Sequence, residues 1–296
     1  MSGKLVTDIL EKNMKNNKIL TYQQIEEIYY YLINHYKLEY YLTNILFVKG
    51  YLKSDIYVAA EYMFAQKIIK VYKKGLKKLS KVVSHEYTLR DKSYKSVFIN
   101  EMIIKVLIHE LMHTGHFKRL FESKNYDFEF EVLRSSYTSN FIYNKFDLPY
   151  LKDYYGTDIE EYYGKDYPLF QQQLNRFMEK LYDFYYYLDP AEINAEYEAI
   201  KEIIFINEYL NPDLNIIWKD MLFEMIRDKY IVQKNHVTCT FKNFIDKRNK
   251  ILTLDKFEYT KDDVRSLSFD KRLSYGLPIT KREYKSMEEH IMSLHL

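Results

Sequence analysis

The chain has 296 residues, 47% of them hydrophobic, and a formal net charge of +2, so it is long enough for one large domain or two small ones with a substantial core. Its balanced charge does not indicate a nucleic-acid-binding protein, and its one cysteine, Cys239, excludes a framework of internal disulfides and fits a reducing compartment. With 32 tyrosines and 18 phenylalanines but only 7 glycines and 5 prolines, the composition disfavours a many-stranded β fold and favours long helices.

The first part of the chain is expected to contain two long helices. Residues 1–20 are polar and predict a loosely held N-terminal arm. Thr21 and Gln24 form a capping-box pattern, which predicts a helix over residues 21–48. A second helix is expected over residues 54–83. Its second half carries lysines at helical spacing, namely Lys67, Lys70, Lys74, Lys77 and Lys81. We interpret them as a solvated helix face, because no aromatic or arginine pattern accompanies them that would favour a patch for nucleic acid or another acidic partner.

A buried helix is predicted in the middle of the chain. The segment from Glu101 to Phe117, EMIIKVLIHELMHTGHF, is apolar almost all round a helix, which is typical of a helix in the core. The polar exceptions form one narrow stripe, which consists of Glu101, Lys105, His109, His113 and His116. Burying such groups is costly unless something pairs them, and a metal ion would do so.

The HExxH pattern at 109–113 predicts a metal site on this helix. His109 and His113 are four residues apart, so both imidazoles stand on one face and can bind a single zinc ion. Glu110 is expected to be the general base, which takes a proton from a water that the zinc acidifies at its open position. The alternatives are a chance match to the pattern and a solvated helix edge whose two histidines bind nothing.

After the motif, further helices are expected. They are predicted over 117–145, 166–188, 189–210 and 211–232, with a long loop at 147–166. Asp189 as N-cap and Pro190 as first helical residue mark the third of these helices, and Asn211-Pro212 ends it. The strand candidates are residues 236–241 and 251–259. Thr280 with Glu283 predicts a last short helix.

These elements predict a mainly α protein. The expected fold is a multi-helix globular domain with the HExxH helix in its core and at most a small β element. Residues 1–20 form the arm, residues 21–255 the helical domain, and residues 256–296 a C-terminal extension that ends in the short helix.

Zinc requires a third protein ligand, and the sequence offers several. The HExxHxxGxxH arrangement fails, because the chain has His116 and Arg119 where glycine and histidine are needed. His116 itself is about two turns from His109, too far along a straight helix for the three histidines to meet one ion easily. Glu192 and Glu196 are four residues apart on one face of the later helix.

The segments HELMH (109–113) and DPAEINA (189–195) together resemble the gluzincin-like metallopeptidases of short bacterial and phage type. In that group a glutamate from a downstream helix, in an E-x-x-A setting after a proline, completes a His-His-Glu site. The resemblance implies that His109, His113 and Glu192 bind one zinc ion, with Glu196 as the alternative to Glu192. Glu192 is also placed to close a capping box with Asp189, which gives it a purely structural alternative role.

Other polar residues are candidates for supporting roles. Asp189, Asn194 and Glu198 are expected as possible hydrogen-bond partners of the ligand histidines. Tyrosines of the run 185–187 are candidate donors to an oxyanion on the substrate. The sequence does not choose among them.

The predicted function is a zinc-dependent hydrolase, specifically a metallopeptidase acting on a peptide or protein. The alternative is a non-catalytic phage virion or assembly protein with a retained or structural metal motif, whose tyrosine-rich faces contact phage or host proteins. Neither nucleic acid nor a membrane is an expected partner. No signal peptide or membrane span is expected, and the Lys, Ile, Asn and Tyr bias fits a low-GC bacterium or its phage. The expected location is the bacterial cytoplasm or the virion.

Overall fold

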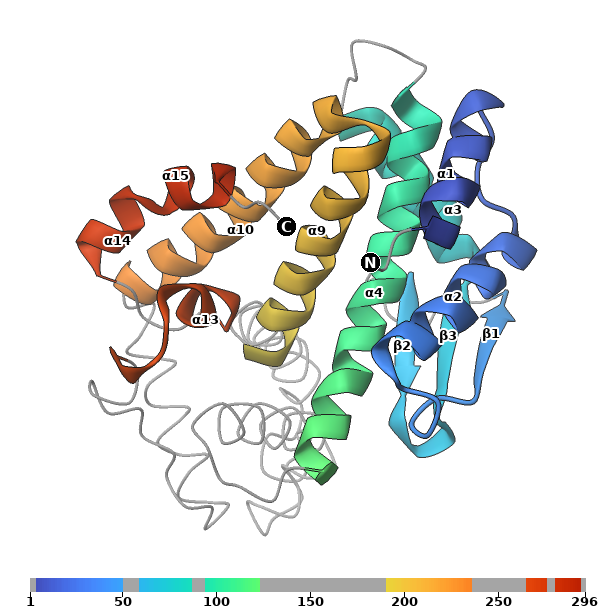
Figure 1. Ribbon diagram of the computed structural model, residues 1–296, viewed down its shortest axis with the longest axis horizontal. Helices are drawn as coiled ribbons and strands as arrows, with labels where there is room; N and C mark the ends of the chain where they lie inside the picture. The colour runs from blue at the N-terminus through green and yellow to red at the C-terminus, as the bar shows by residue number, and fades with distance from the viewer. Residues whose placement is uncertain are drawn as a thin grey trace, which may run out of the picture. The chain divides into compact units, whose positions relative to one another are not determined.

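The computed structural model describes residues 4–49, 59–86, 94–122, 190–235, 265–275 and 280–293. Within these ranges the protein is mainly helical and contains one three-stranded sheet, which confirms the predicted mainly α fold with a small β element (Figure 1). The chain divides into two units, one of Met1–Glu122, Asn194–Asp228 and Ile279–Leu296, and one of Ser123–Ile193 and Lys229–Pro278. No helix among the described residues has the length and apolar character needed to cross a membrane.

The N-terminal segment is a helix, α1 (Lys4–Lys15), and not a loosely held arm. Val6, Ile9, Leu10 and Asn13 recur at helical spacing and are buried. The helix packs against α2 (Tyr22–Tyr36) and α4 (Tyr94–Glu122). An amphipathic stripe within a polar composition is enough to dock a short helix, which is why the polar average of these residues was misleading.

The predicted helix over 21–48 is correct only in its first half. Its start is confirmed, because Thr21 and Gln24 form the capping box. The helix α2 ends at Tyr36, where Lys37 adopts a left-handed conformation with φ of 55°. The chain then forms strand β1 (Asn44–Val48). The left-handed residue ends the helix without a glycine and well before the predicted end at residue 48.

The predicted helix over 54–83 is also wrong in residues 59–72, the first half of its described part. Its described part contains β2 (Ala60–Met63), the 3-10 turn η1 (Phe64–Gln66), β3 (Ile68–Tyr72) and only then the helix α3 (Lys73–Glu86). Lys67 has φ of 52° and turns the chain between β2 and β3. The apolar run of β3 has the buried pattern of a central strand, which periodicity alone does not distinguish from a buried helix.

The sheet has the order β1-β3-β2. β1 is parallel to β3, and β2 is antiparallel to it, with Tyr62 opposite Ile69. β2 is therefore at one edge of the described sheet, and this strand packs against α4. An edge strand of the sheet therefore packs against the helix that contains the HExxH motif.

Helix α4 is the centre of the first unit. It is continuous from Tyr94 to Glu122, so Gly115 does not end it. Ile104, Leu107, Ile108 and Leu111 are almost fully buried, as the sequence predicted for this helix. It packs against α1, α2, α3 and β2. Figure 1 shows the sheet on one side of α4 and the helices α9 (Pro190–Leu210) and α10 (Asn215–Asn235) on the other.

The later helices begin and end close to where the sequence predicted. α9 starts at Pro190 and ends at Leu210, and Asn211 precedes the short 3-10 turn η3 (Pro212–Leu214) that leads into α10. Thr280 and Glu283 form the predicted capping box of α14 (Lys281–Lys285), which α15 (Met287–Met292) follows. In the second unit, α13 (Phe269–Ser274) buries Leu273. The predicted elements at 123–188, the strand candidates at 236–241 and 251–259, and the domain boundary at 255 lie outside the described residues.

Candidate metal centre

The two motif histidines face each other on α4. Both are buried, with 9% of His109 and 8% of His113 exposed. Their Nε2 atoms are 3.1 Å apart. Two nitrogens bound tetrahedrally to one zinc ion, each at about 2.0–2.1 Å, are separated by about 3.3 Å. The pair therefore has nearly the spacing that a shared metal ion requires.

Glu192 completes the group. Ligand atoms of His109, His113 and Glu192 all lie within 4.8 Å of one another. The division between the two units falls in α9 between Ile193 and Asn194, but the helix is continuous from Pro190 to Leu210. Glu192, in the first turn of α9, therefore belongs to the same helix as Asn194 and Glu196, which contact α4. Two imidazole nitrogens and one carboxylate form a donor set suited to a catalytic zinc ion.

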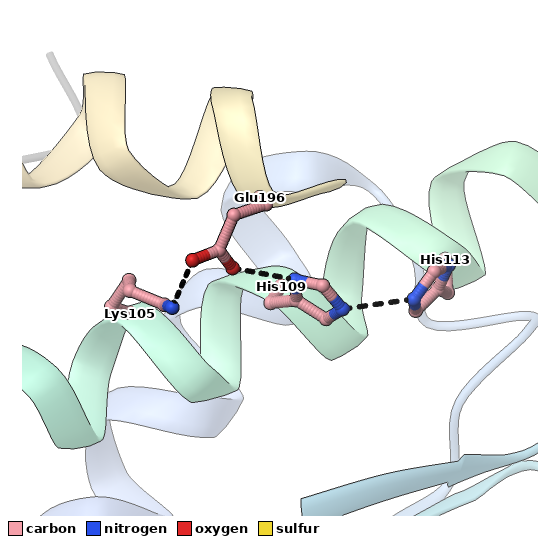
Figure 2. Close-up of polar contacts among 4 residues, drawn as sticks. All are labelled: Lys105, His109, His113 and Glu196. Carbon is pink, nitrogen blue, oxygen red and sulfur yellow. Dashed lines mark hydrogen bonds and ion pairs between the residues drawn. The ribbon is translucent and has the colours of Figure 1, made fainter. Parts of the chain in front are cut away.

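The alternative ligand, Glu196, has other partners in the structure. Its Oε2 is 3.1 Å from Nδ1 of His109, and its Oε1 forms an ion pair with Nζ of Lys105 (Figure 2). Burial alone would raise the pKa of Glu196, but the charge of Lys105 and the contact with His109 outweigh it and hold the pKa well below its usual range. The carboxylate is therefore ionised.

The ionised carboxylate of Glu196 determines the tautomer of His109. A carboxylate can only accept hydrogen bonds, so Nδ1 of His109 carries the proton and donates it to Glu196. In the neutral ring, Nε2 then carries the lone pair, and Figure 2 shows this nitrogen on the side of the ring that faces His113. Carboxylates hold metal-binding histidines in this way in many metal sites. Neither this role of Glu196 nor the ion pair with Lys105 was predicted from the sequence, although Lys105 belongs to the same polar stripe.

His116 does not join the cluster. It is buried, and its Nε2 is 2.7 Å from Oδ1 of Asn194. Asn194 was a candidate partner for the ligand histidines, and it instead contacts this third histidine of the stripe. Glu198 acts electrostatically on Tyr36 of α2. Asp189 and the tyrosines 185–187 lie outside the described residues.

Glu110 is held by the edge strand. Its Oε2 accepts a hydrogen bond of 2.8 Å from the backbone N–H of Tyr62 in β2. Glu110 is only partly buried, unlike the histidines on either side of it. The charge of Glu110 also contributes to the raised pKa of Tyr72, after burial and the contact of Tyr72 with Glu61. The predicted general base thus lies beside β2, and it is adjacent in sequence to the candidate ligand His109.

A separate buried carboxyl lies two turns before His109. Glu101 is fully buried, and its Oε2 accepts a hydrogen bond of 2.7 Å from Nε1 of Trp218 in α10. Asn207 of α9 is close enough to influence the pKa of Glu101, yet Oε1 of Glu101 has no well-formed hydrogen bond among the described residues. Burial raises the pKa of Glu101 to about 7, although Trp218 and Asn207 favour the ionised form. The carboxyl group of Glu101 thus links α4 with α9 and α10.

Comparisons of the chain with protein-family models, with curated proteins and with solved structures found no match.

Proposed function

We propose that the protein is a zinc-dependent hydrolase, and that His109, His113 and Glu192 are the ligands of one ion. The observation that carries the proposal is the convergence of these three side chains from two helices at the HExxH motif. Three protein ligands with nitrogen and oxygen donors leave a fourth position open, which is typical of catalytic and not of structural zinc sites.

Each neighbouring residue has a definite task in this proposal. Glu196 holds His109 with Nε2 toward the metal. Glu110, held by Tyr62, accepts a proton from the attacking water and passes it to the leaving group. Bound zinc supplies Lewis acidity, which polarises a substrate carbonyl and lowers the pKa of water.

A peptide is the substrate class that we propose. β2 is an edge strand of the described sheet, and the backbone N–H of its residue Tyr62 holds Glu110. An extended peptide can pair with the part of the outer edge that Glu110 does not occupy, and this would bring its backbone close to the general base. The motif resemblance to gluzincin-like metallopeptidases favours the same substrate class.

The test measures metal content and hydrolysis on the same preparations. Purified protein should contain about one equivalent of zinc by mass spectrometry and should cleave peptides from a random-sequence library. Glu110→Gln should retain the zinc and lose roughly 10²–10⁴-fold in cleavage rate, because only the proton transfer is removed. Glu122→Gln, an exposed position on the same helix, is the matched control and should change neither quantity.

Two outcomes contradict the proposal in different ways. Protein that takes up no divalent metal at neutral pH would remove the metal site itself. Protein that binds zinc but cleaves none of the library peptides would instead support the structural metal site of the non-catalytic alternative.

A further inference from the structure

Helix α9 has two glutamates, Glu192 and Glu196, on the side that faces α4. Only Glu192 belongs to the cluster with His109 and His113 that could bind a metal ion. Glu192 and Glu196 are one helical turn apart, so both stand on the same face of α9. Glu192 lies with His109 and His113, whereas Glu196 lies at Nδ1 of His109, the ring nitrogen that does not contact His113. The two residues have the same side chain, so their surroundings must produce this difference.

Lys105 is the residue that distinguishes the surroundings of Glu196. It is one turn before His109 on α4, and its ammonium group forms an ion pair with Oε1 of Glu196. The Lys105 side chain is only 12% exposed and that of Glu196 is 26% exposed. An ion pair so poorly hydrated is screened much less than a surface pair, so it has a real effect on where the carboxylate lies. With Lys105 on one oxygen and His109 on the other, both oxygens of Glu196 are engaged.

We infer that Lys105 is a positioning residue that selects Glu192 as the metal ligand by holding Glu196 against Nδ1 of His109. The inference rests on the proposed metal site. A divalent cation attracts any carboxylate that can reach it, and glutamate has three side-chain torsions with which to reach. Lys105 neutralises the charge of Glu196 in an ion pair, so Glu196 does not compete with Glu192 for the metal ion. Loss of the lysine charge would release Glu196 toward the metal.

The experiment measures zinc affinity by competition with a chromophoric chelator. Glu192→Gln should weaken zinc binding at least roughly 100-fold relative to wild type, because one of three ligands is lost. The double variant Lys105→Met/Glu192→Gln should regain at least roughly tenfold, because Glu196 is free to replace the missing ligand. Methionine keeps the apolar stem of the lysine and removes only its charge.

Two further variants test whether Lys105 acts by its charge on the choice of ligand or only supports the structure. Lys105→Arg/Glu192→Gln keeps the positive charge and should bind zinc as weakly as Glu192→Gln. The triple variant Lys105→Met/Glu192→Gln/Glu196→Gln should lose the regained affinity, because the replacement ligand is gone. Circular dichroism of the metal-free proteins verifies folding. Where the methionine variant lacks the wild-type spectrum, Lys105→Gln takes its place.

The failures of this inference and of the proposed function are distinguishable. A folded double variant that regains no affinity would overturn the inference while the metal site stands. Recovery that persists in the triple variant, or that also occurs with arginine, would overturn it as well. Two results would overturn the assignment of the ligands and the inference together. The first is a wild-type protein that binds no zinc, and the second is a Glu192→Gln variant that binds zinc as tightly as the wild type.

Discussion

The buried carboxyl of Glu101 should make the stability of the protein depend on pH in a way that Glu101→Gln removes. The group is fully buried and is joined to α10 by Trp218. A neutral carboxyl can donate a hydrogen bond toward the neighbouring Asn207, which an ionised one cannot. Glutamine has nearly the same shape and also has a donor at this place. The variant should therefore fold like the protonated wild type.

The magnitude follows from the two pKa values. Burial raises the pKa of Glu101 from its ordinary value of 4.5 to about 7. A raised pKa means that the folded state keeps its proton while the unfolded chain has lost it, so stability decreases as pH rises between these two values. Over the whole window the loss is about 3 kcal/mol at about 1.4 kcal/mol per pKa unit. Below pH 4.5 and above pH 7 this group should contribute no further change.

The assay is urea denaturation followed by circular dichroism from pH 4 to 8, in the presence of a chelator so that the metal site does not contribute. The free energy of unfolding of Glu101→Gln minus that of wild type should increase with pH by about 3 kcal/mol. Glu208→Gln, an exposed position on α9, should give a difference that does not change in this way. A difference for Glu101→Gln that stays constant across the window would refute the argument that the buried carboxyl is protonated.

Three further predictions concern the metal, the buried hydrogen bond and a helix cap. Zinc at 100 times its Kd should stabilise the wild type by about 2.7 kcal/mol in thermal denaturation, and Glu192→Gln should show much less of this effect; equal stabilisation of both proteins would count against Glu192. Trp218→Phe removes the donor to Glu101 and should cost about 1–3 kcal/mol in urea denaturation at pH 8; an unchanged stability would contradict the contact. Thr21→Ala removes the cap that holds the N–H of Gln24 and should cost about 1 kcal/mol in the same assay, whereas a loss below measurement error would show that the cap is dispensable.

The sequence was sufficient for features that depend on neighbouring residues. The buried helix around HExxH, the start of α9 at Pro190 and the capping boxes at Thr21 and Thr280 are all local, because each depends on residues within one or two turns. The same locality placed His109 and His113 on one face of α4. The mainly α class followed from the scarcity of breakers.

The sheet was decided by tertiary contacts. The segment of β3 has an apolar run that fits a buried helix as well as a strand, and only its pairing with β1 and β2 resolves the choice. Lys37 and Lys67 turn the chain in left-handed conformations, which cannot be predicted from the residue type because lysine rarely adopts them. The sequence therefore predicted helices where long-range hydrogen bonding produced strands.

The centre shows the same division between local and long-range information. By itself the sequence determined that His109 and His113 stand on one face of a buried helix, because a periodicity of 3.6 residues places them there. Spacing alone could not decide between Glu192 and Glu196, since both share one face of α9, and only the resemblance favoured Glu192. In the proposed site that choice depends on Lys105, which lies about 90 residues earlier in the chain and meets Glu196 only when α4 and α9 pack together. The physical reason is that charge pairing across helices depends on distance in space, which spacing along the chain does not encode.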